Sequence, residues 1–165
     1  MFGAFWIAKA RAACVQALQP LVTRPSFTDP WPPDFWRDPF VVGFVVAVTA
    51  LITKIVGRGK LTRLQSGHVV TGTLKDLGAP LADFQNRAEQ SIREGNPDYK
   101  QGLLNGETLV VYVFNLDPMT GDPDVAAATE MARHTTLTGK VDRDEIGGSL
   151  MHLLFHQVVK KRLGC

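Results

Sequence analysis

The sequence predicts a single-pass membrane protein, with one transmembrane α-helix and a small, helix-dominated α+β soluble domain. Three observations predict this class. An uncharged apolar run covers residues 40–53, basic residues follow it directly, and the last hundred residues alternate between amphipathic and apolar patterns. The chain has 165 residues, of which 45% are hydrophobic and 21% are charged. This composition excludes a disordered or collagen-like chain and fits one ordinary domain.

The charges are unevenly distributed along the chain, although the net charge is only +2. Residues 39–64 carry four basic side chains and no acidic one, whereas residues 65–165 carry ten basic and thirteen acidic side chains. Because no basic excess runs through the chain, we expect no nucleic-acid partner.

Residues 1–22 are predicted to form an amphipathic helix. The segment is rich in alanine and contains Lys9 and Arg11 but no acidic residue. Such a segment resembles an organelle targeting peptide, here one that is not cleaved and lies on the membrane or on a partner. An ordinary surface helix is the alternative. Residues 23–39 form a linker rich in proline and aromatic residues, with Trp31 and Trp36 placed as interfacial aromatics.

Residues 40–56 are predicted to form the transmembrane helix. With Pro39 and a snorkelling Lys54 the usable length is about 18 residues, or roughly 27 Å. A buried core helix or a valine-rich strand is the alternative. Since basic residues follow the run and acidic ones precede it, the positive-inside rule places residues 57–165 in the cytoplasm or matrix. Residues 1–38 would then lie on the opposite face.

The predicted span offers a packing face rather than a reactive group. It contains no ionisable side chain before Lys54, so it is a poor path for protons or ions. Gly43, Ala47 and Ala50 share one helical face, where small residues let a neighbouring helix approach closely. Ordinary use of small residues is the alternative reading.

Residues 57–165 are predicted to form the soluble domain, beginning with helices over 61–77 and 80–94. Their apolar stripe indicates a core, with a partner-binding groove as the alternative. Asn105-Gly106 is typical of a tight turn, and residues 109–116 read as a buried strand. A short helix over 124–134, a weaker strand over 135–140 and a largely buried final helix over 142–163 follow.

The sharpest candidate site is the pair His152 and His156, four residues apart on the predicted final helix. Two such imidazoles can share a metal ion if His68, His134 or Cys165 supplies a third ligand. More often such histidines have no metal role, so we expect no metal, no cofactor and no catalytic residues. Residues 147–151 and 57–62 fail the nucleophile-elbow and phosphate-loop patterns. Cys14 and Cys165 are predicted on opposite membrane faces, which argues against a disulfide.

These observations predict a non-catalytic accessory subunit, structural or assembly-related, of a large membrane complex. The preferred setting is an energy-transducing inner membrane, such as that of a respiratory-chain complex or ATP synthase. We expect other subunits and the lipid bilayer as partners, in the mitochondrial or a bacterial inner membrane. The alternatives are a membrane-tethered metal-binding or enzymatic domain using His152 and His156, or a bacterial inner-membrane protein that recruits a cytoplasmic partner.

Overall fold

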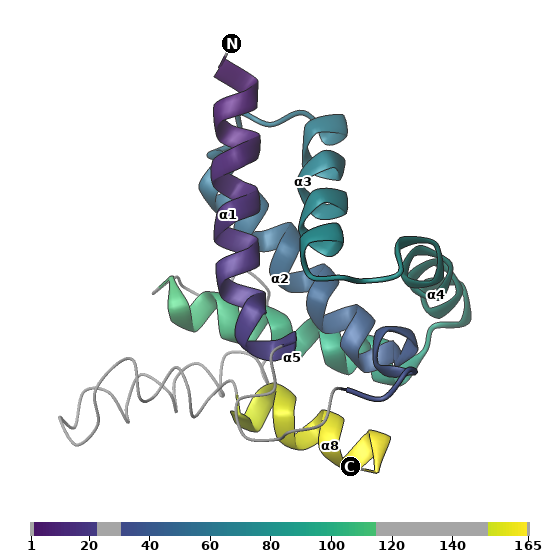
Figure 1. Ribbon diagram of the computed structural model, residues 1–165. Coiled ribbons are helices and arrows are strands. Elements are labelled where there is room, and N and C mark those ends of the chain that lie inside the picture. Colours follow the sequence, from purple (N-terminus) through teal and green to yellow (C-terminus); the bar gives the residue numbers. More distant parts are fainter. Residues whose placement is uncertain (1, 23–30, 115–151, 165) are drawn as a thin grey trace, which may run out of the picture.

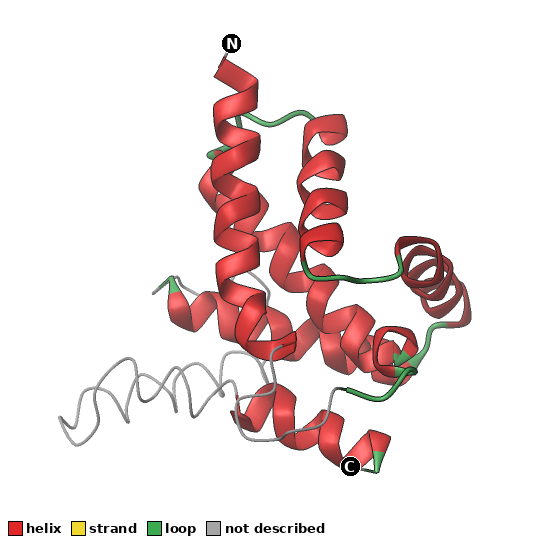
Figure 2. Cartoon of the chain, viewed as in Figure 1, coloured by secondary structure: helices red, strands yellow, loops and turns green. Residues whose placement is uncertain are grey.

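The computed structural model describes residues 2–22, 31–114 and 152–164, and every element in these ranges is a helix (Figure 2). The predicted dominance of helices is therefore confirmed for the described part of the chain, which contains no strand. The elements are α1 (Phe2–Val22), η1 (Phe35–Arg37), α2 (Pro39–Gly57), α3 (Arg63–Asp76), α4 (Leu81–Glu94), α5 (Pro97–Val113), η2 (His152–His156) and α8 (Gln157–Leu163).

Helix α2 is the centre of the fold, and it packs against α1, α3, α4 and α5 (Figure 1). Pro39 begins the helix, and the Asp38 carboxylate accepts hydrogen bonds from the amides of Phe40 and Val41. Arg58 closes it in the left-handed conformation. By length and composition α2 could cross a membrane, yet 67% of this stretch is buried inside the chain.

Helix α1 is part of the core of the described fold. Ala10, Cys14, Leu18 and Leu21 recur every three or four residues and are buried against the rest of the bundle. On the same helix Arg11 forms an ion pair with Asp76, the last residue of α3. The predicted topology placed these two residues on opposite sides of a bilayer. In the described fold these two side chains are in contact.

Helices α3 and α4 confirm the helices predicted over 61–77 and 80–94. A capping box begins α3, in which Thr62 and Gln65 each bond the backbone amide of the other. The turn between the two helices passes through Gly78, which has a φ of +75°. Gly95 ends α4 in the left-handed conformation, as the Gly-Asn-Pro sequence suggests.

Helix α5 corrects two predictions. Residues 109–113 belong to this helix and not to a strand, and Asn105-Gly106 lies inside it rather than at a turn. Asn96 caps α5 by accepting hydrogen bonds from the amides of Asp98 and Tyr99. The apolar run misleads because a helix buried against α2 and a strand buried on both faces have the same composition. The helix and strand predicted over 124–140 lie outside the described residues.

The described part of the predicted final helix is buried on one side only. Phe155 and Val159 are fully buried, whereas Leu154 and Val158 are half-buried and His152 is exposed. The Phe155 ring centroid lies 4.7 Å from that of Phe44 and 6.2 Å from that of Phe40. The segment therefore covers the beginning of α2 instead of forming the centre of a domain. Residues 142–151 of the prediction are outside the described ranges.

Candidate functional site

Helices α2 and α5 approach each other closely where they cross. Gly102 and Gly106 stand one turn apart on α5, and Gly43 faces them from α2. A methyl group at Gly102 would overlap the Phe40 carbonyl oxygen, and one at Gly43 would overlap the carbonyl oxygen of Tyr99. The two backbones therefore touch, which only glycine at these positions permits.

This crossing occupies most of the packing face that the sequence indicated. Gly43 and Ala47 both contact α5 of the same chain, so they are not available to a neighbouring subunit in this fold. Ala50 is exposed and lines a separate cavity of about 290 Å³ between α2 and α3. The face was recognised from its small residues. Its partner was missed because Asn105-Gly106 was predicted to form a turn, so no helix was expected at Gly102 and Gly106.

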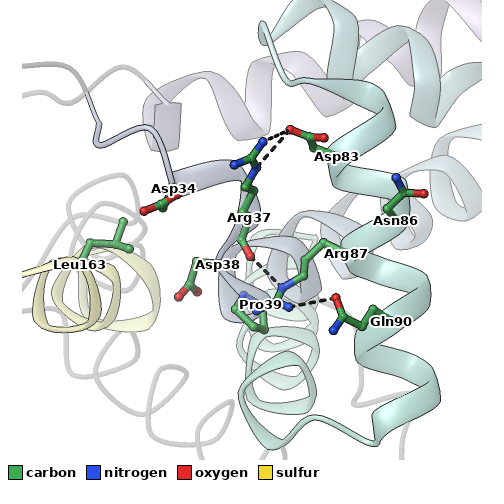
Figure 3. Close-up of a pocket in the computed structure, with 9 residues that line it drawn as sticks. All are labelled: Asp34, Arg37, Asp38, Pro39, Asp83, Asn86, Arg87, Gln90 and Leu163. Atoms are coloured by element: carbon green, nitrogen blue, oxygen red, sulfur yellow. Dashed lines mark hydrogen bonds and ion pairs between the residues drawn. The ribbon is translucent and has the colours of Figure 1, made fainter.

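A polar cavity of about 570 Å³ lies beside the Pro39 end of α2 (Figure 3). Two of its arginines bind other residues of the lining. Arg37 forms an ion pair of 2.6 Å with Asp83, while Arg87 donates to the Arg37 carbonyl oxygen and to Gln90. These bonds fasten η1 to α4.

Arg162 of α8 joins the first turns of α2 and α5. Its guanidinium lies 3.1 Å from the carboxylate of Asp38, the cap of α2, and 2.8 Å from that of Asp98. The hydrogen bond from Arg162 lowers the pKa of Asp98. This bridge was not predicted, since it joins residues more than 60 positions apart. The only signal of this bridge in the sequence was the basic last turn of the predicted final helix.

The histidine pair lies within an aromatic cluster. The ring centroids of His152 and His156 are 6.0 Å apart, and His156 lies parallel to Trp31 at 6.4 Å. Burial lowers the pKa of His156, whose Nε2 atom has no hydrogen-bond partner within the described structure. The described residues contain no group of three metal-ligating side chains. His68 is on α3, and His134 and Cys165 lie outside the described ranges.

Cys14 is a buried thiol between α1 and α2. Its Sγ lies 3.8 Å from the Thr49 carbonyl oxygen and from the Thr53 hydroxyl. Burial raises the pKa of this thiol to about 11, so it stays protonated and unreactive at neutral pH. Residues 147–151, which fail the nucleophile-elbow pattern, lie outside the described structure. Residues 57–62, which fail the phosphate-loop pattern, connect α2 to α3.

The Gly57 end of α2 differs from the Pro39 end, where the polar cavity lies. Here the start of α1, the end of α2 and the start of α3 come together (Figure 1). Trp6 has Lys9 and Lys60 over its ring, at 5.6 and 5.1 Å from the centroid. Phe5 and Leu64 are 60% and 73% exposed. We call this surface the basic–aromatic end, and it comprises Phe5, Trp6, Lys9, Lys54, Arg58, Lys60, Arg63 and Leu64.

The cations of the basic–aromatic end have no acidic partner among the residues that the structure describes. None of the described acidic residues forms an ion pair with Lys9, Lys54, Arg58, Lys60 or Arg63. The sequence analysis recognised four of these five cations, but only as a topology signal. Comparisons with protein-family models, with curated proteins and with solved structures found no match to this chain.

Proposed function

We propose that this protein is a non-catalytic accessory subunit of a membrane complex, with a structural or assembly role. One observation carries the proposal. Helix α2 is the one described helix long and apolar enough to cross a membrane, and unpaired cations gather at one of its ends. Apolar length followed by a basic flank is the pattern of a membrane-embedded helix.

The absence of a catalytic role is supported by the polar groups of the described residues. The guanidinium of Arg37 is bound to Asp83, and that of Arg162 to Asp38 and Asp98. The Cys14 thiol is protonated. These groups hold helices together, as expected of a scaffold.

We further propose an energy-transducing inner membrane as the setting, mitochondrial by preference and bacterial as the alternative. The support is the acid-free, arginine-containing α1. Its buried face supplies Cys14 and Leu18 to the core, so α1 has to be retained after any targeting. The partners in this proposal are other subunits of the complex and the lipid bilayer.

A second candidate is a peripheral helical scaffold in which α2 is a core helix and does not cross the bilayer. The observation that favours it is the burial of α2 by neighbouring helices. Helices α1, α3, α4 and α5 of the same chain pack against it, and 67% of its apolar stretch is buried. Such burial is typical of the central helix of a globular domain.

One substitution separates the two candidates. Ala50 is exposed near the middle of α2, so Ala50→Lys is tolerated on a globular domain. In a lipid-facing span the same lysine costs about 2.5–3.5 kcal/mol. Gln85→Lys, at an exposed position of α4, is the matched control.

The measurement is alkaline carbonate extraction of the full-length protein from membranes, followed by native separation and mass spectrometry in mild detergent. A spanning subunit resists carbonate, co-migrates with complex subunits, and loses both properties with Ala50→Lys but not with Gln85→Lys. Release by carbonate, with both variants behaving as wild type, would overturn the spanning proposal in favour of the peripheral scaffold. Migration as a lone chain would refute both.

A further inference from the structure

We infer that the basic–aromatic end binds the surface of an anionic phospholipid bilayer. The inference deepens the proposed function, because it rests on a membrane setting and names the class of lipid. It does not require that α2 crosses the bilayer, since the surface lies at one end of the bundle and is exposed in either case.

The first step is charge. The three helices that meet here contribute three exposed cations, and the connection between α2 and α3 contributes Arg58 and Lys60. No aspartate or glutamate occurs in residues 39–75 or in α1. Each lysine or arginine near an anionic leaflet strengthens binding by about fivefold. Because no described acidic side chain pairs with these cations, their charge is available to a ligand.

The second step is the apolar component. Phe5 and Leu64 are two of the most exposed large apolar side chains among the described residues. Phe5 contacts Trp6, and Leu64 follows Arg63 in the first turn of α3. Trp6 meets the ring of Phe5 edge-on at 5.4 Å and stacks under two lysines. Aromatic and aliphatic side chains surrounded by cations suit the boundary between headgroups and acyl chains.

The apolar component also decides between partners. A nucleic-acid surface offers charge, but it gives an exposed Leu64 no apolar phase to enter. An anionic bilayer satisfies both components at once. We therefore commit to the bilayer, and binding to nucleic acid becomes an outcome of the test.

The third step is the contrast with the opposite end of α2. There Arg37 and Arg162 are bound to carboxylates of the same chain, which leaves little free charge for a ligand. Arg93, Lys100 and Lys161 likewise form no ion pair with a described acidic residue, but α4 and α5 also carry acidic residues. The Gly57 end differs because residues 39–75 and α1 contain no aspartate or glutamate.

The test is flotation of the purified full-length chain with vesicles of phosphatidylcholine alone or of phosphatidylcholine mixed with phosphatidylglycerol. A basic-end triple variant carries Lys9→Gln, Arg58→Gln and Lys60→Gln. Its control carries Arg93→Gln, Lys100→Gln and Lys161→Gln, at exposed positions on α4, α5 and α8. Both variants lose three charges, so only the position differs. Circular dichroism melting establishes that each variant folds.

We expect the wild type to bind the phosphatidylglycerol vesicles much more tightly than the neutral ones, with weaker binding at high salt. The basic-end variant should lose on the order of 100-fold in affinity, and the control less than about fivefold. Phe5→Ala and Leu64→Ala should each weaken binding by on the order of fivefold. Ile92→Ala, at an exposed residue of α4, should leave it unchanged.

Equal losses in the two triple variants would overturn the inference, as would equal binding to neutral and anionic vesicles. Tighter binding to duplex DNA than to vesicles, with no effect of Phe5→Ala or Leu64→Ala, would replace the bilayer with nucleic acid. Failure of the inference is distinguishable from failure of the proposed function. Insertion into neutral vesicles with carbonate resistance leaves a spanning α2 in place, whereas charge-dependent flotation that carbonate reverses supports this surface alone.

Discussion

The two ends of α2 differ in what their charges contact. At the Pro39 end, Arg37 binds Asp83, and Arg162 binds Asp38 and Asp98. At the Gly57 end, Lys60 and its neighbours have no carboxylate partner among the described residues. The charges at the Pro39 end therefore hold helices of the fold together. Charge at the second end is free for a partner.

The two halves of α2 also differ in how they pack against the neighbouring helices. The first half of α2 contacts α5 backbone to backbone at Gly43 and supports the Phe155 ring. The second half contacts α1 and α3 through side chains such as Cys14 and Thr53. We therefore expect stability to depend mainly on residues around the Pro39 end.

The largest expected effect is that of Phe155→Ala. Phe155 is fully buried against Phe40 and Phe44, so its truncation should lower the free energy of unfolding by about 3–5 kcal/mol. Denaturant titration measures this. Leu154→Ala is the control, because Leu154 is only half-buried and should cost less. Equal costs would contradict the assignment of Phe155 to the core.

A glycine pair tests the crossing. Gly102→Ala inserts a methyl group into the backbone of α2 and should lower the free energy of unfolding by about 1–3 kcal/mol. Gly67→Ala, in α3 with nothing within 4 Å of the added methyl, should raise it by about 0.5–1 kcal/mol. Thermal melts of both variants measure the difference. Effects of the same sign would show that α5 does not touch α2 in this way.

Arg162→Gln tests the bridge at the Pro39 end. At neutral pH it should lower the free energy of unfolding by about 1 kcal/mol, and less at high salt, because the pair is partly exposed. Arg162 lowers the pKa of Asp98, so this stabilisation is present above the ordinary carboxyl pKa and is lost as pH falls through the lowered value. The difference between the wild type and the variant should therefore begin to shrink below about pH 4 and vanish only below the lowered pKa of Asp98.

Denaturant titrations at several pH values provide the measurement for this bridge. Lys161→Gln, on the neighbouring exposed residue, should show neither the loss nor the pH dependence. A difference between wild type and Arg162→Gln that persists at low pH would assign the effect to packing of the arginine stem rather than to the ion pair.

The smallest effect on stability is expected at the Gly57 end. Arg63 is exposed, and Arg63→Gln should change the free energy of unfolding by less than about 0.5 kcal/mol. The same variant should weaken binding to anionic vesicles. A large loss of stability would show that the cations of this end also support the fold, and the comparison between the two ends would fail.

Local signals in the sequence were sufficient for several helices. The apolar stripe through Leu74 and Phe84, with Gly78 between the helices, predicted α3 and α4 closely. For residues 109–113 the strand predicted from the apolar pattern was wrong. An apolar run does not say whether it will be buried as a helix or as a strand, and here the contact with α2 decides in favour of a helix.

Composition and local spacing are enough to establish the helical character of the described residues, the apolar length of α2 and the uneven charge along its flanks. These properties follow from composition and from spacing over a few residues. Only the tertiary structure decided which charges are neutralised, that Arg11 meets Asp76, and that Gly43 packs against α5 rather than another subunit. Such pairings join residues tens of positions apart, and their free energies depend on distances that exist only after the helices have packed.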